Sequence, residues 1–148
     1  MRTPMSHETV FSIINFVAIA GWILLLVAPG RRIVTDVLAS VLIPAAMAVF
    51  YIGVLAAVWG RSEGSFSTLA GVSTLFKEPW LLLAGWAHYL AFDLFVGSWE
   101  VRDARKRQIP HLLVIPCLIS TLMFGPLGWL LYMAIRAARG AGLRVEAA

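Results

Sequence analysis

The chain has 148 residues, of which 60% are hydrophobic and 14% are charged, and its mean hydropathy is +0.84. A soluble domain is roughly 45–50% apolar and about 25% charged. The composition therefore excludes a disordered chain, a disulfide scaffold and an ordinary water-soluble enzyme, and it predicts a membrane protein. At roughly 20 residues per span, residues 1–148 have room for one transmembrane domain of about four helices.

The charge and cysteine counts limit the partners, disulfides and metal sites that the chain can have. The formal net charge is +4, from 12 Lys and Arg against 8 Asp and Glu. Because no basic region lies outside the apolar segments, nucleic acid is not expected as a partner, whereas membrane lipids are, since juxtamembrane Lys and Arg face anionic headgroups. Cys117 is the only cysteine of the sequence, which excludes an internal disulfide and a multi-cysteine metal site.

The first two apolar runs predict two membrane spans. The run over residues 10–28 is uncharged and longer than the apolar core of a signal peptide. It ends at Pro29-Gly30 without a cleavage motif, so we expect it to remain as a span. A second run covers residues 33–59 and contains Pro44, which is expected to kink the helix.

The next segment changes character. Residues 60–78 are polar at first and then apolar at helical spacing, which predicts a short amphipathic helix on the membrane surface. A third span is predicted over residues 79–97, because it opens with proline, a favoured first helical residue. No helix breaker precedes Pro110, so this helix is expected to continue to about residue 108, beyond the bilayer.

The fourth predicted span covers residues 112–137. Pro116 and the step Gly125-Pro126 lie inside it, so one bent helix is expected. The predicted fold class is all-α: an integral membrane bundle of four transmembrane helices, with a short interfacial amphipathic helix between spans two and three. With four spans, the Lys and Arg residues divide equally between the two sides of the membrane, so the positive-inside rule predicts no orientation.

Ionisable side chains within a span are functional candidates, because each costs at least about 2.5–3.5 kcal/mol at a helix centre. At about 100° per residue, one face of the third helix contains Tyr89, Asp93, Gly97 and Glu100. His88 projects roughly 140° away from Asp93. Asp93 and Glu100 lie roughly 10 Å apart along the axis, which is too far to share one proton but fits two carboxyl groups acting on different parts of one ligand.

Each of these residues also has a structural interpretation. Asp93 then pairs with an arginine or bonds a hydroxyl group of a neighbouring helix, for which the candidates are Tyr51, Ser120 and Thr121. Glu100 and Asp103 then belong to a solvated ion-pair face with nearby arginines. In the same interpretation His111 only caps the fourth helix.

A metal site is a further alternative. Enough nitrogen and oxygen ligands for one ion are offered by His88, Asp93, Glu100, Asp103 and His111. Their spacing matches no established metal motif, so neither a metal nor another cofactor is expected. Cys117 has apolar neighbours, among which a thiol usually packs rather than reacts.

Several of these positions together resemble the abscisic-acid-deficient-four-like family. The resemblance covers the chain from about Gly71 to Tyr132. It rests on Trp86-x-His88, Asp93-Leu94-Phe95, Asp103, His111 before the last span and Gly125-Pro126 within it. Members are small four-span membrane proteins of plastids and bacteria, and the plant members are implicated in forming neoxanthin from violaxanthin. Trp99-Glu100 departs from the plant pattern, and the lack of a plastid transit peptide predicts a bacterial protein of the inner membrane.

The resemblance implies an enzyme that isomerises a carotenoid epoxide or another isoprenoid lipid. Opening an epoxide to an allenic alcohol involves no redox change and needs an acid and a base. The residues expected to be catalytic are Asp93 as the acid, His88 or His111 as the base, and Asp103. The residues expected to bind substrate are Trp86, Tyr89, Gly97 and Glu100.

An apolar substrate is expected to enter sideways from the bilayer, and a homo-oligomer is compatible with the sequence. A different class of function is also compatible with it. The protein then binds a carotenoid or lipid without converting it, or assists the assembly of a larger membrane complex.

Overall fold

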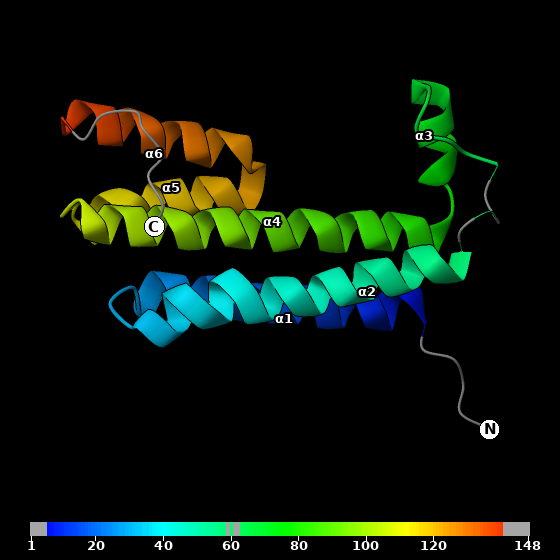
Figure 1. Ribbon diagram of the computed structural model, residues 1–148, viewed down its shortest axis with the longest axis horizontal. Helices are drawn as coiled ribbons and strands as arrows, with labels where there is room; N and C mark the ends of the chain where they lie inside the picture. Colours follow the sequence, from blue (N-terminus) through cyan, green and yellow to red (C-terminus); the bar gives the residue numbers. More distant parts are fainter. Residues whose placement is uncertain (1–5, 59, 61–62, 141–148) are drawn as a thin grey trace.

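The computed structural model describes residues 6–58, 60 and 63–140, which are helical and contain no strand. Three helical segments are long and apolar enough to cross a membrane: His7–Val27, Ile33–Val58 and Pro79–Lys106. The first is helix α1 and the third is helix α4. α4 lies in the middle of the molecule, with the first two segments on one side and the C-terminal helices on the other (Figure 1). The predicted all-helical membrane fold is confirmed.

The second segment changes its winding along its length. Residues Ile33–Leu42 form a π-helix, η1, and Ile43–Val58 continue as the α-helix α2. The change comes directly before Pro44, which has no N–H to donate to the preceding turn. The irregularity expected at this proline therefore takes the form of wider turns before it, in a helix that runs on without a break.

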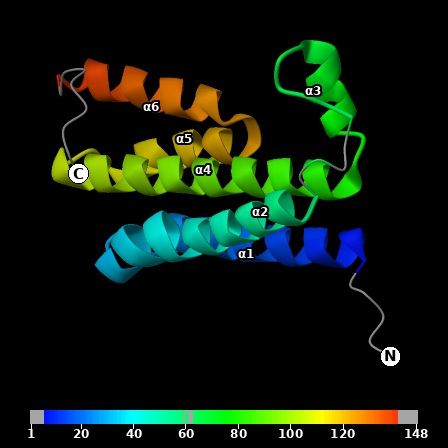
Figure 2. The same ribbon diagram turned by 45° about the vertical axis from the view of Figure 1, so that its right-hand side comes forward.

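A short helix separates the second and third segments. Helix α3, Leu69–Leu75, begins at Thr68, whose Oγ1 accepts a 3.0 Å hydrogen bond from the Gly71 amide. Its seven residues are too few to span a membrane. Figures 1 and 2 show α3 running across the direction of α4, as a helix on the membrane surface would. A short helix at this point of the chain was predicted, and its contact with the membrane surface stays a prediction.

Helix α4, Pro79–Lys106, is the longest element. Its first turn is capped by Glu78, whose Oε2 accepts a 2.7 Å hydrogen bond from the Leu81 amide. The helix ends where Gln108 adopts a positive φ of 56°. The helix therefore continues past residue 97, as expected, as far as Lys106, and its projection beyond the bilayer stays a prediction.

The prediction of one bent helix over residues 112–137 is wrong. The structure has two helices here, α5 (His111–Phe124) and α6 (Pro126–Ala138), which run in opposite directions (Figures 1 and 2). Gly125 between them has φ 50° and ψ −98°, a conformation that residues with a side chain rarely adopt. Pro126 then starts a new helix. Each helix is only about 20 Å long, which is shorter than the roughly 30 Å thickness of an apolar layer, so neither helix is long enough to cross it.

The two helices of the hairpin touch along their backbones at Gly128. A Cβ atom added to this glycine would overlap the backbone nitrogen and Oγ1 of Thr121, and it would lie 2.5 Å from the carbonyl oxygen of Cys117. Glycine is therefore the one residue type that permits this contact.

We expect Gly128→Ala to separate α5 from α6 and to lower the free energy of unfolding by about 1–3 kcal/mol. A matched control is Gly53→Ala in α2, since a Cβ atom there would meet nothing within 4 Å. Thermal unfolding of both variants in detergent checks the prediction. Equal melting temperatures for the two variants would contradict it.

Because of the hairpin, the charged residues are distributed differently from the arrangement predicted for four spans. It returns the chain to the end of the molecule that holds the C-terminus of α4 (Figure 1). Within the described residues, Lys77 lies at the opposite end, and the other cationic side chains gather at this one: Arg31, Arg32, Arg102, Arg105, Lys106, Arg107, Arg136 and Arg139. The equal division predicted for four spans does not hold, and the positive-inside rule now predicts that this end is cytoplasmic.

Labelling of single cysteines by a membrane-impermeant maleimide tests both the hairpin and the orientation. In a Cys117→Ser background, we expect Gly30→Cys and Arg139→Cys to react only from the cytoplasmic side. Ser73→Cys in α3 should react from the other side. All three positions are exposed. Four complete spans would instead place position 139 on the same side as position 73.

Candidate functional site

The predicted polar face of α4 points towards the turn of the α5–α6 hairpin. Tyr89 and Asp93 lie one helical turn apart on this face, so their side chains are neighbours. The Oδ2 atom of Asp93 is buried and has no hydrogen-bond partner among the described residues. A Cβ atom on Gly125 would lie 3.1 Å from the Oδ1 atom of Asp93. The hairpin turn therefore covers the carboxyl group of Asp93, about midway along α4. The described neighbours of this carboxyl group are uncharged.

A second carboxyl group lies two turns further along the same face. Glu100 is fully buried, and its Oε1 atom accepts a 3.0 Å hydrogen bond from Oγ1 of Thr121 on α5. Its Oε2 atom is buried and has no hydrogen-bond partner among the described residues. The prediction of a solvated ion-pair face at Glu100 is wrong, because the hairpin covers this face of α4. Thr121, suggested as a partner of Asp93, bonds Glu100 instead.

Asp103 continues this face but has a different environment. Its Oδ2 atom accepts a 2.6 Å hydrogen bond from the Tyr132 hydroxyl and lies 3.3 Å from Nε of Arg136, which is completely buried. Arg107 donates from Nε to both carboxylate oxygens at 3.0 and 3.1 Å. Asp103 is only 2% exposed, so here too the expected solvation is wrong. Its oxygens serve to fasten α6 to α4, and a catalytic role for Asp103 stays a prediction.

Tyr132 and Arg136 were not identified from the sequence, because Arg136 reads as part of a basic tail after the last span. The only sequence signal for them is their spacing. They lie one helical turn apart on α6 and therefore share one face.

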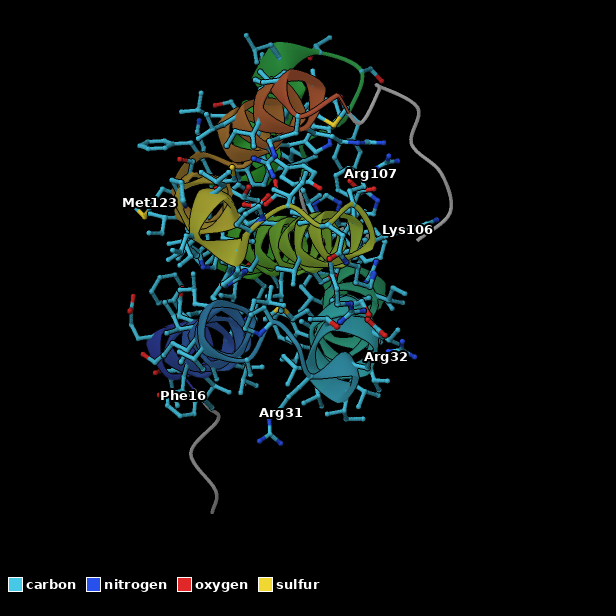
Figure 3. All side chains as sticks on the ribbon, turned by 90° about the vertical axis from the view of Figure 1, so that its left-hand side faces the viewer. Phe16, Arg31, Arg32, Lys106, Arg107 and Met123 are labelled. Atoms are coloured by element: carbon cyan, nitrogen blue, oxygen red, sulfur yellow. The ribbon has the colours of Figure 1, made fainter. Side chains whose placement is uncertain are left out.

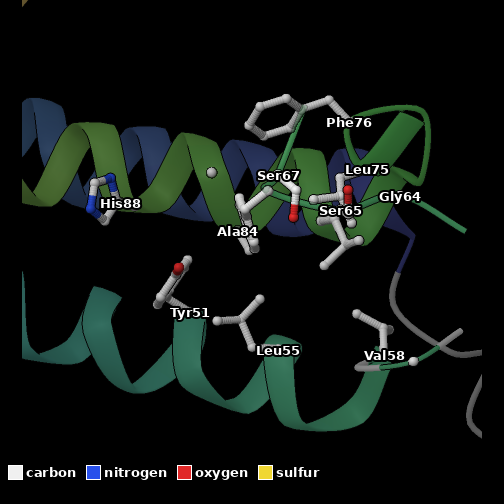
Figure 4. Close-up of a pocket in the computed structure, with 14 residues that line it drawn as sticks. Tyr51, Leu55, Val58, Gly64, Ser65, Ser67, Leu75, Phe76, Ala84 and His88 are labelled. Atoms are coloured by element: carbon white, nitrogen blue, oxygen red, sulfur yellow. The ribbon is translucent and has the colours of Figure 1, made fainter. Parts of the chain in front are cut away.

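His88 lies on another face of α4, as its position on the helix predicts. It lines a cavity of about 650 Å³ between α2, α4 and the segment around α3. Figure 4 shows its ring directed towards Tyr51 of α2, and the two ring centroids are 5.6 Å apart. Most of the lining is apolar, with hydroxyl groups from Ser65 and Ser67. The structure therefore does not bring His88 together with Asp93.

His111 is also distant from Asp93. It begins α5, and its Nε2 atom is 3.0 Å from the carbonyl oxygen of Leu26 near the end of α1. The turn that contacts Asp93 is at the opposite end of α5, about 20 Å away. The interpretation that His111 caps the fourth helix is wrong, because α5 has no side-chain cap and His111 instead contacts the last turn of α1.

Trp86 and Gly97 contact helix α1. Trp86 stacks on Tyr89, with ring centroids 5.4 Å apart, and its Nε1 donates a 3.2 Å hydrogen bond to Oδ1 of Asn15. Asn15 was missed in the sequence, although an amide within an apolar span is itself a signal. A Cβ atom on Gly97 would lie 2.6 Å from the indole of Trp22. The room at Gly97 is therefore occupied by Trp22, and substrate contact at Gly97 stays a prediction.

Within the described residues, no group of three or more His, Cys, Asp or Glu side chains is close enough to hold a metal ion. The arrangement has two separate parts. One is the pair of buried carboxyl groups, Asp93 and Glu100, beneath the hairpin. The other is the cavity lined by His88 and Tyr51.

Together these features define a small helical membrane protein whose longest helix carries carboxyl groups that the C-terminal hairpin covers. The chain belongs to the ABA DEFICIENT 4-like family, whose model matches residues 9–132. The match confirms the resemblance seen in the sequence and extends it over α1, η1 and α2. No curated protein and no solved structure matches the chain.

The Asp103 cluster yields a prediction about stability. We expect Arg136→Gln to lower the free energy of unfolding by about 3–5 kcal/mol, because it leaves the buried carboxylate of Asp103 with one cation fewer. Arg139→Gln removes the same charge from an exposed position on the next turn and should change stability by less than about 0.5 kcal/mol. Thermal unfolding measured by circular dichroism compares the two. A similar loss for both variants would contradict the assignment.

Proposed function

We propose that this protein isomerises a lipid-soluble isoprenoid, with a carotenoid epoxide as the favoured substrate, by acid–base chemistry within the bilayer. The observation that carries the proposal is the buried Oδ2 atom of Asp93, which has no hydrogen-bond partner in the described part of the chain. Membership of the ABA DEFICIENT 4-like family supports the substrate class.

A carboxyl group at this depth is costly, and such groups usually mark a path for protons or a ligand. Asp93 does not have the compensation that Asp103 obtains from arginines, since its described contacts are the Tyr89 hydroxyl and Gly125. Its side chain is only partly covered, and the neighbouring Trp86 is 37% exposed. A long apolar molecule in the bilayer therefore has access to this face from the side.

The proposed reaction balances without an oxidant or a reductant. Asp93 gives a proton to the epoxide oxygen as the carbon–oxygen bond breaks. A base removes a proton from carbon, and the electrons of that bond form the new double bond. We assign the base to Glu100, because it shares the face of Asp93 whereas His88 and His111 do not. Since Glu100 is fully buried, the substrate has to enter between α4 and α5 to reach it. The enzyme is restored when Glu100 loses a proton and Asp93 regains one, and because the two groups lie roughly 10 Å apart along the helix, this exchange passes through intervening proton carriers.

A second candidate function is binding without conversion. The cavity lined by His88 and Tyr51 is about 650 Å³ in volume and has a mostly apolar lining that contains neither Asp93 nor Glu100. It is suited to hold one end of an apolar molecule. In this case the two carboxyl groups contribute only to packing and specificity of the fold.

Pigment analysis of a host that makes epoxidised carotenoids tests the proposal. Expression of the wild-type chain should yield a new pigment of the same mass as its precursor. We expect Asp93→Asn and Glu100→Gln each to reduce its formation by at least about 100-fold, the usual contribution of a general acid or base. The matched control is Glu8→Gln, an exposed acidic residue at the start of α1, which should leave conversion unchanged.

The other outcomes are equally informative. Full conversion by a folded Asp93→Asn variant would overturn the proposed mechanism. A pigment that copurifies unchanged with the wild-type protein, and is lost on His88→Ala, would establish the binding function instead. Circular dichroism and gel filtration show whether each variant is folded.

A further inference from the structure

A second polar site lies at the other side of α4, near its C-terminal end. It is a pocket of about 690 Å³ between η1 and α4. Four of its lining residues are cationic, namely Arg32, Arg102, Arg105 and Lys106, and Asp36 is the one acidic residue in the lining. In Figure 3, Arg32 and Lys106 lie on the same side of the molecule, whereas Arg31 points away from it. The pocket therefore carries an excess of positive charge.

The two inner arginines are held in place by η1 and α4. Arg102 donates from Nη1 to the carbonyl oxygen of Thr35 at 2.9 Å and to Oγ of Ser98 at 3.1 Å. Both acceptors are neutral, so these bonds orient the guanidinium group without cancelling its charge. Arg105 donates to Oγ1 of Thr35 at 3.2 Å and forms a 3.2 Å ion pair with Asp36. The pocket thus has four cationic residues against one carboxylate, and the two inner arginines are held in position.

The wall nearer the middle of the membrane is apolar. Val41 of η1 and Phe95 of α4 line the pocket, and they are 53% and 45% exposed. A ligand that fills the pocket therefore meets cations at one end and exposed hydrocarbon at the other. π-Helical turns are frequent at functional sites, and η1 contributes Asp36 and Ser40 to the lining.

We propose that this pocket binds a phosphate group, carried by an anionic phospholipid whose chains lie along Val41 and Phe95. Basic pockets between membrane helices on the cytoplasmic side are suited to anionic headgroups, and the positive-inside rule predicts that this pocket is on that side. A free phosphate ion offers the same charged chemistry but leaves the apolar wall uncovered. The proposal does not depend on the isomerase function, because it concerns a different face of α4.

Native mass spectrometry of the delipidated protein tests the proposal, with phosphatidylglycerol as the probe and phosphatidylcholine as the neutral comparison. The test variant is Arg32→Gln/Lys106→Gln, which removes two exposed cations from the rim and leaves Arg102 and Arg105 in place. The control is Arg31→Gln/Arg139→Gln, which removes two cations from the same end of the molecule but outside the pocket lining.

We expect the wild-type and control proteins to retain phosphatidylglycerol with similar affinity, and the test variant to bind it at least about tenfold more weakly. Equal losses in both double variants, or equal retention of phosphatidylcholine by the wild type, would overturn the proposal. An excess of inorganic phosphate separates the two sources of the anion. If phosphatidylglycerol stays bound, the result supports a phospholipid as the ligand of the pocket. If phosphate displaces it completely, the result overturns the phospholipid as the ligand and assigns the pocket to soluble phosphate.

Discussion

The buried contact of Asp103 with Tyr132 and Arg136 holds the C-terminal half of the structure together. It fixes the end of α6 against the end of α4, so the hairpin has to lie along α4 instead of crossing the membrane as a fourth span. This placement in turn brings Gly125 over Asp93 and Thr121 against Glu100. An ion pair removed from water is strong only when its geometry is good, and here the tyrosine hydroxyl completes it.

Much of the architecture follows from the apolar pattern of the sequence. The three long helical segments, the short helix between the second and third, and the shared face of Tyr89, Asp93 and Glu100 all depend on local composition and helical spacing. The reversal at Gly125 could not be predicted in this way, because a kinked span and a hairpin have the same hydropathy. The choice between them is made by tertiary contacts, above all at Gly128 and Arg136.

Only part of the candidate site could be predicted from the sequence, because the other part depends on the tertiary contacts of the hairpin. Helical geometry placed Asp93 and Glu100 together and His88 apart from them, and the structure agrees. The burial of Glu100 and Asp103 depends on the hairpin. The arginines that surround them in the sequence therefore wrongly indicated a solvated face. The result is an uneven division of the carboxyl groups of α4. Asp103 is neutralised by cations and has a structural role, whereas Asp93 and Glu100 each keep a buried oxygen atom with no described hydrogen-bond partner.

The short hairpin gives the two leaflets of the membrane different amounts of protein. In the described part of the chain, α5 and α6 lie along the C-terminal half of α4, where they add two helices to α1, η1 and α4 (Figures 1 and 2). The molecule is therefore a wedge, and its broader end is the one that the positive-inside rule predicts to be cytoplasmic. Such a shape displaces more lipid from one leaflet than from the other, so the protein should respond to the curvature and lateral pressure of its membrane.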